Sequence, residues 1–186
     1  MLVLIVLCVV AFIVVLYGTK LYNALVALKN NVRKSWANID VLLKQRHDEI
    51  PKLVDVCSGY MKYERDTLEA VVKARSAAVT SQGVGAQAQS EGTLSAALGK
   101  LFALSEKYPD LKANENFGHL RNRVSEIENK IADRREFYND SVNIYNIRIQ
   151  QIPDSFLASI LNYQPETLFA ATAAEKEDVK IAFNMP

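Results

Sequence analysis

The chain has 186 residues, and its 22 Lys and Arg side chains nearly balance its 21 Asp and Glu side chains, so that the net charge at pH 7 is +1. The charges are balanced, and no basic stretch is interleaved with aromatic residues. The sequence therefore gives no electrostatic reason to expect nucleic-acid binding. The two cysteines, Cys8 and Cys57, lie in an apolar run and in a helix-like segment. We expect no structural disulfide between them.

The amino-terminal residues 1–17 contain no charged, amide or hydroxyl-aliphatic side chain, and the first acidic residue is Asp40. A helix rises about 1.5 Å per residue, so this run is at the lower limit for crossing a hydrocarbon core of about 30 Å. Gly18, Thr19 and a snorkelling Lys20 supply the remaining length. We predict a transmembrane anchor over residues 1–19, followed by one helical domain over residues 20–186.

The apolar run also resembles a targeting signal, which would be removed. A secretory signal peptide needs a basic amino-terminal region and a small-x-small cleavage site, and neither is present. A lipoprotein signal needs a small residue directly before its cysteine, whereas Leu7 precedes Cys8. We therefore expect the anchor to stay uncleaved.

The charges beside the anchor predict its orientation. Lys20, Lys29, Arg33 and Lys34 follow the run, and no Lys or Arg precedes it. By the positive-inside rule the amino terminus lies outside and the domain lies in the cytoplasm. A periplasmic domain is the alternative, because long domains are sometimes translocated despite the flanking charge.

Apolar residues after the anchor recur at alternating steps of four and three, which is typical of a helix packed along one stripe. In the first helix they are Leu21, Leu25, Leu28, Val32, Trp36, Ile39 and Leu43, and Arg46 takes the next stripe position. Residues 20–50 contain no Gly or Pro, so the anchor and this helix form one rod. Asp48 offers an N-cap and Pro51 suits a first helical turn. We favour a tight hairpin here over a kinked continuation.

The second helix extends to Val79, and residues 80–92, with three glycines, predict a loop. A third helix runs from about residue 91 or 93 to 107 and stops at Tyr108-Pro109. Asn114 can cap a fourth helix, whose stripe extends from Phe117 to Ile152, before Pro153. A short apolar segment (156–161) and a tail with Val179, Ile181 and Phe183 follow. This order predicts an all-α protein with an antiparallel up-down four-helix bundle, a short carboxy-terminal helix and a tail.

The best reactive constellation is His47-Asp48-Glu49, but three consecutive helical or turn residues point in different directions and cannot converge on one metal. We interpret it as a helix corner, with Asp48 as the cap. His119 follows Glu115 by four residues, and no second such pair exists to build a di-iron site. We therefore predict no catalytic residue, no cofactor-binding residue and no metal ligand, and we expect that the protein is not an enzyme.

Polar groups in the fourth helix and the turn before it allow two interpretations. Tyr138-Asn139 and Tyr145-Asn146 repeat at seven residues. They form either a binding groove or, as we prefer, a core stripe of Tyr with Asn that is solvated or makes hydrogen bonds between helices. Lys112, Asn114, Glu115 and Asn116 could hold an anion, but helix caps use the same residues. We also expect Trp36 to fill the core or a helix seam.

Five segments in order resemble one known family: LYNALVALKNNVRKSW (21–36), RHDEIPKLVDVCSGY (46–60), TLEAVVKAR (67–75), LFALSEKYPDLKANENF (101–117) and ENKIADRREFYND (128–140). The chain resembles the LemA family. The resemblance implies a bacterial membrane protein with a short outer amino terminus, one span and a helical bundle, and it carries over no catalytic residue. Such proteins are often encoded near membrane peptidases or TPM-domain proteins, and relatives in magnetosome-forming bacteria are linked to membrane shaping.

Two functions fit these features. The preferred one is a scaffold of the bacterial inner membrane that homo-oligomerises through helix faces and organises or shapes the membrane. The alternative is an accessory or adaptor subunit of a membrane peptidase or signalling protein. The expected partners are the lipid bilayer, further copies of the chain and a possible membrane protein, but no nucleic acid.

Overall fold

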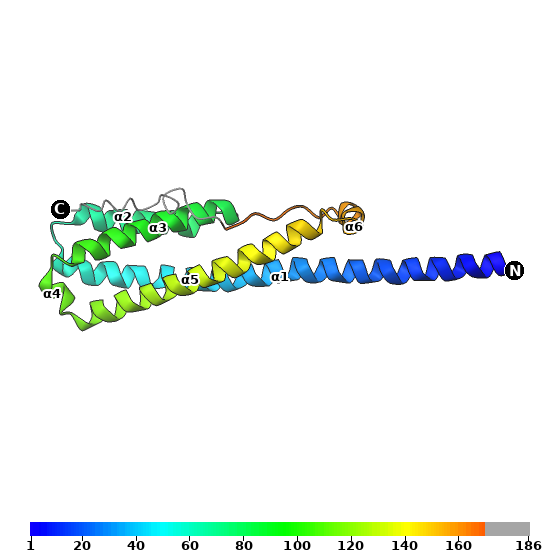
Figure 1. Cartoon of the computed structure of the whole chain (residues 1–186). Coiled ribbons are helices and arrows are strands. Elements are labelled where there is room, and N and C mark those ends of the chain that lie inside the picture. Colours follow the sequence, from blue (N-terminus) through cyan, green and yellow to red (C-terminus); the bar gives the residue numbers. More distant parts are fainter. Residues whose placement is uncertain (170–186) are drawn as a thin grey trace, which may run out of the picture. The chain divides into compact units, whose positions relative to one another are not determined.

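The computed structural model describes residues 1–169, and every regular element in that part of the chain is a helix (Figure 1). The helices are α1 (Leu2–Tyr60), α2 (Arg65–Thr80), α3 (Val84–Ser105), α4 (Pro109–Lys112), α5 (Glu115–Arg148) and α6 (Asp154–Ile160). The predicted all-α class, with a long apolar amino-terminal helix, is confirmed. The predicted tail residues Val179, Ile181 and Phe183 lie outside the described residues.

The chain divides into two compact units, and α1 and α5 contribute to both. We call residues 1–41 with 132–168 the anchor unit. We call residues 42–131, with Phe169 among the described residues, the bundle unit.

The predicted hairpin at Pro51 is wrong, because α1 continues through Pro51 to Tyr60. A proline inside a helix lacks the N–H that would bond the carbonyl four residues earlier, which here belongs to His47. That carbonyl instead accepts a hydrogen bond of 2.7 Å from the Nε–H of Arg75 in α2. The contact with Arg75 satisfies the freed carbonyl, and the chain reverses only after Tyr60.

The chain reversal lies between α1 and α2 and is held by two tyrosine hydroxyls. The hydroxyl of Tyr108 donates to the Glu64 carboxylate at 2.9 Å. The Asn114 amide donates to the hydroxyl of Tyr60, also at 2.9 Å. The turns at the same end of the bundle unit are thereby tied to one another.

The loop predicted over residues 80–92 is much shorter than expected, because α3 already begins at Val84. Only residues 81–83 connect α2 to α3, and Gly83 there has a φ of 81°, which favours glycine. Ala88 and Glu91 are buried in the first turns of α3. These tertiary contacts, which the glycine-rich composition did not reveal, favour helix in this segment.

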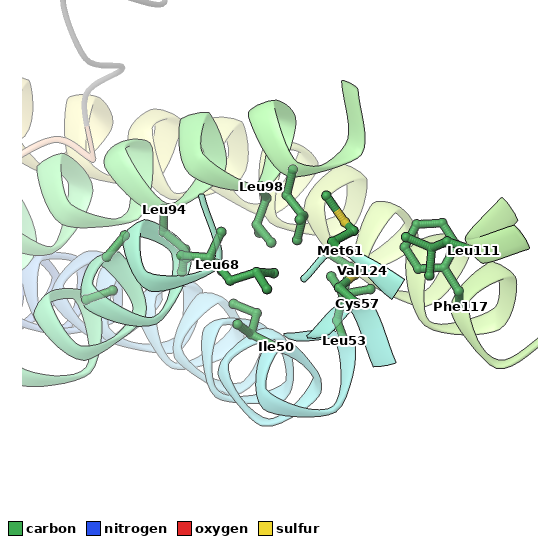
Figure 2. Packing of buried hydrophobic residues seen from close by; sticks show 14 residues of the cluster. Ile50, Leu53, Cys57, Met61, Leu68, Leu94, Leu98, Leu111, Phe117 and Val124 are labelled. Atoms are coloured by element: carbon green, nitrogen blue, oxygen red, sulfur yellow. The ribbon is translucent and has the colours of Figure 1, made fainter. Parts of the chain in front are cut away.

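The core of the bundle unit gathers residues from α1, α2, α3, α4 and α5 (Figure 2). Its members are Ile50, Leu53, Cys57, Met61, Leu68, Val71, Ala74, Ala78, Leu94, Leu98, Leu101, Leu111, Phe117 and Val124. Most belong to the predicted stripes, and short connections make the four long helices the bundle that the sequence predicted. Burial raises the pKa of the Cys57 thiol to about 11.

In the anchor unit α1 and α5 pack antiparallel. The rings of Trp36 and Tyr138 lie 5.4 Å apart, and the hydroxyls of Ser35 and Ser141 are 3.1 Å apart. The side chains of Leu25, Val32 and Ile39 are buried on the α1 side. Trp36 therefore fills a helix seam, as expected.

The tyrosines of α5 form the core stripe that we preferred over a binding groove. Tyr138 and Tyr145 are buried, and their hydroxyls donate to the carbonyls of Thr167 and Gln164 at 2.9 and 3.2 Å. Asn146 donates to the Glu166 carbonyl at 2.9 Å and accepts from the Glu166 N–H at 2.8 Å. This pairing holds the extended segment after α6 against α5.

Candidate functional site

A buried charge cluster in the bundle unit is the most chemically distinctive feature of the described residues. The Arg46 side chain on α1 is 1 % exposed and forms ion pairs with Glu91 of α3 and Glu128 of α5. Arg46 also donates to the hydroxyl of Ser95 at 2.9 Å, and this hydroxyl donates to Glu128 at 2.9 Å. Three helices are thereby joined through one guanidinium.

His47 adds a second contact to the same carboxylate. Its Nε2 lies 2.9 Å from Oε1 of Glu91, while the other oxygen of Glu91 contacts Arg46. Buried charges are costly unless they are paired and hydrogen-bonded. The two glutamates pair with the charge of Arg46 from two facing helices, so the cluster fixes the register of α1, α3 and α5.

The helix corner predicted at His47-Asp48-Glu49 is wrong, because all three residues lie inside α1. Asp48 is exposed and caps no helix, and Glu49 accepts from Lys52 at 3.2 Å. Only His47 takes part in the charge cluster. Within residues 1–169, no group of three or more His, Cys, Asp or Glu side chains is arranged to hold a metal ion.

Sequence reasoning placed Glu91 at the edge of a loop and so missed its pairing with Arg46. The available signal was a charged residue at a stripe position, since Arg46 follows Ile39 and Leu43 in the apolar repeat. A charge on a buried stripe requires a partner of opposite sign on a facing helix. The sequence does not say which glutamate provides it.

The turn before α5 is a helix cap. Asn114 accepts a hydrogen bond of 3.0 Å from the N–H of Phe117, which confirms the predicted cap. The ammonium of Lys112 bonds to Glu106 at 2.6 Å, and Arg121 bonds to the same carboxylate at 3.0 Å. These two cations hold the pKa of Glu106 below its usual value. Lys112 is therefore directed at a carboxylate, not at an anion at the start of α5.

An open groove of about 490 Å³ lies beside α2 in the bundle unit. Its lining residues are Val54, Ser58, Arg65, Leu68, Glu69, Val72 and Lys73. The hydroxyl of Ser58 donates to the carbonyl of Asp55 at 2.7 Å, and no histidine or cysteine lines the groove.

The anchor unit carries two apolar surfaces, and the first is the start of α1. The large apolar side chains of residues 1–17 are exposed. Among the described residues, α1 is the one helix long and apolar enough to cross a membrane, judged by length and composition.

The second apolar surface is a stripe on α5. Phe137, Ile144 and Ile147 are 67 %, 56 % and 56 % exposed. At about 100° per residue these three side chains project within one arc of the helix, opposite the buried Tyr138, Val142 and Tyr145. We call Phe137, Ile144 and Ile147 the outer stripe.

Comparison with known proteins supplies relatives for this architecture. Residues 35–183 match the model of the LemA family. Magnetosome protein MamQ 2 of Paramagnetospirillum magneticum is 26% identical over 190 residues, which cover 88% of this chain and 69% of that protein. Magnetosome protein MamQ of Magnetospirillum gryphiswaldense is 26% identical, with 86% and 67% covered. Protein LemA of Metamycoplasma hominis is 25% identical, with 84% and 72% covered.

Proposed function

Because the chain belongs to the LemA family, we propose that it is a membrane-anchored helical scaffold that homo-oligomerises and organises or shapes the membrane. The exposed apolar start of α1 fits a membrane-anchored protein. We place it in the bacterial inner membrane, with the amino terminus outside and the bundle in the cytoplasm. The scaffold acts by contact between helix faces and not by catalysis.

The outer stripe is the observation that carries this proposal. α5 uses one face to pack in the anchor unit and presents Phe137, Ile144 and Ile147 on the other. Exposed apolar groups that gather on one face are typical of interaction surfaces, whereas single exposed ones need no explanation. In an isologous contact the same surface of two copies meets, so the partner of the outer stripe is the outer stripe of a second copy of the chain.

Anchoring strengthens contacts of this kind. Copies held in one bilayer share a plane, so that their effective concentration is high and weak lateral contacts become significant. Two relatives are named as magnetosome proteins, and the membrane shaping that the family resemblance implies for such relatives is the role that we propose for this chain.

Cysteine cross-linking in intact membranes tests the proposal. Ile144→Cys in a background with Cys8→Ser and Cys57→Ser should give a covalent dimer band after oxidation, because the single cysteine of each chain can join two copies. Arg134→Cys is the matched control, because Arg134 is exposed on the same helix and in the same unit but projects about 100° away from the centre of the outer stripe. A monomer band alone for Ile144→Cys at normal expression would contradict the scaffold function and favour the adaptor function.

A further inference from the structure

The short helix α6 has its polar and apolar faces reversed relative to a helix in water. Ile152, just before it, and Phe156 and Ile160 within it are 78 %, 67 % and 80 % exposed, and they are spaced four residues apart. Asp154 and Ala158 are also four residues apart, and both are buried. Residues four apart within a helix share a face, so α6 turns Phe156 and Ile160 outward, and Ile152 is exposed just before the helix begins.

Three contacts fix α6 in place within the anchor unit. Asp154 pairs with Arg148 at the end of α5 at 2.9 Å. The N–H of Tyr163 bonds to the carbonyl of Ala158 at 2.9 Å. The ammonium of Lys29 on α1 then lies 4.1 Å from the centre of the Tyr163 ring. The outward face of α6 is therefore held in one orientation beside α1.

The contact of Tyr163 with Lys29 places α6 beside the part of α1 that follows the apolar run. Figure 1 shows α6 beyond the carboxy-terminal end of α5, on the side of the amino-terminal end of α1, and lying across the direction of α1. Lys29 follows Tyr17 by twelve residues, or about 18 Å of helix. Tyr17, at the end of the apolar run, and Tyr22 are both exposed, as aromatic residues at a membrane interface are.

The charges around α6 suit a lipid surface. Between residues 141 and 165 the only acidic side chain is Asp154, which is buried and paired with Arg148. Lys20, Lys29, Arg33 and Lys34 follow the apolar run on α1. A cationic surround with an apolar helix face is the pattern of helices that lie in the headgroup region.

We propose that α6 is an interfacial helix, which inserts Ile152, Phe156 and Ile160 into the headgroup–acyl boundary of the bilayer that α1 crosses. This inference rests on the proposed anchoring by α1 and goes beyond it, because it gives the anchor unit a second membrane contact. Helices of this type bury their apolar face about 5–10 Å into that boundary. A second attachment point beside a span restricts how the anchor unit tilts in the membrane.

Tryptophan quenching by brominated lipids tests the inference with the full chain. The protein carries Trp36→Phe, so that each variant has one tryptophan, and it is reconstituted in vesicles of phosphatidylcholine and phosphatidylglycerol. Phe156→Trp should emit at shorter wavelength and be strongly quenched by lipids brominated near the headgroup. Ile160→Trp, on the same face, should behave alike. Phe137→Trp on the outer stripe is the matched control and should be quenched little.

The possible outcomes separate this inference from the proposed function. Quenching of a Phe12→Trp reference without quenching at positions 156 and 160 overturns the interfacial helix and leaves the anchor intact. A blue-shifted but unquenched Phe156→Trp also overturns it, because protein, such as a second copy, would then cover the face. Equal quenching of Phe137→Trp contradicts a contact specific to α6. Absence of quenching in Phe12→Trp overturns the anchor and the inference together.

Discussion

Arg46 shows how one residue sets the packing of the bundle unit. Its guanidinium is buried and pairs with Glu91 and Glu128 from two other helices. Glu91 also contacts His47, so it serves two buried partners at once. Removing Glu91 takes one of two carboxylates from Arg46 and the carboxylate contact from His47, which costs more than losing an exposed pair.

We predict that Glu91→Ala lowers the free energy of unfolding by about 1–3 kcal/mol, because Arg46 and His47 each lose a buried partner while Glu128 still pairs with Arg46. Glu69→Ala is the matched control, because it removes the exposed pair between Arg65 and Glu69 at 2.7 Å and should cost about 0–1 kcal/mol. Denaturant unfolding followed by circular dichroism measures both. Equal losses in the two variants would show that the buried cluster does not contribute as described.

Some of the residue contacts could be predicted from the sequence, and others could not. The burial of Tyr138 and Tyr145 and the cap at Asn114 followed from periodicity and from capping chemistry. The pairing of Arg46 with Glu91 did not, because it depends on which helices face each other across 45 residues of sequence. Periodicity identifies a buried stripe but does not identify its partner.

At the scale of elements, α1 depends on a contact from α2 where Pro51 interrupts its hydrogen bonds. Arg75 donates to the His47 carbonyl that Pro51 cannot reach. Asp48 and Pro51 are residue types that occur at the start of a helix, but both can also lie inside one. The sequence therefore favoured a hairpin, and the decisive contact comes from a residue 28 positions away.

We predict that Arg75→Ala destabilises the bundle unit by about 1–3 kcal/mol, because a carbonyl loses its partner. In a Pro51→Ala background the same change should cost less, since the new N–H of residue 51 can bond His47 within the helix. A double-mutant cycle of unfolding free energies measures this coupling. Additive effects would mean that Arg75 does not compensate for Pro51.

The packing of α5 in the anchor unit should weaken at high pH. Burial, with a smaller effect of the Glu166 carboxylate, raises the pKa of Tyr138 to about 12, and the same causes raise that of Tyr145. Unfolded tyrosines ionise near pH 10, so between about pH 10 and 12 the folded state binds more protons than the unfolded state. Stability is therefore complete below pH 10 and falls as the pH rises toward 12.

Fluorescence of Trp36, whose ring lies 5.4 Å from that of Tyr138, should report this alkaline transition. Tyr138→Phe is the control, because it removes the hydroxyl and should flatten the dependence of stability on pH in this range. A parent protein whose Trp36 signal is unchanged up to pH 12 contradicts the burial argument.

For the whole molecule, the proposed orientation in the membrane rests on the charges beside the apolar run. Four cations and no acid follow the apolar run before residue 40. We predict that green fluorescent protein fused to Pro186 is fluorescent and that an alkaline phosphatase fusion at the same site is inactive. The opposite pair of results would place the bundle on the outer side of the membrane.

The number of copies in one membrane particle tests directly whether the chain is a homo-oligomeric scaffold. The full chain is extracted with its surrounding lipid in polymer nanodiscs, and the mass of single particles gives the number of protein copies. We predict particles with two or more copies for the parent chain and a shift to single copies for Phe137→Ser with Ile144→Ser. Single copies of the parent chain, especially with a different membrane protein bound, would contradict the scaffold.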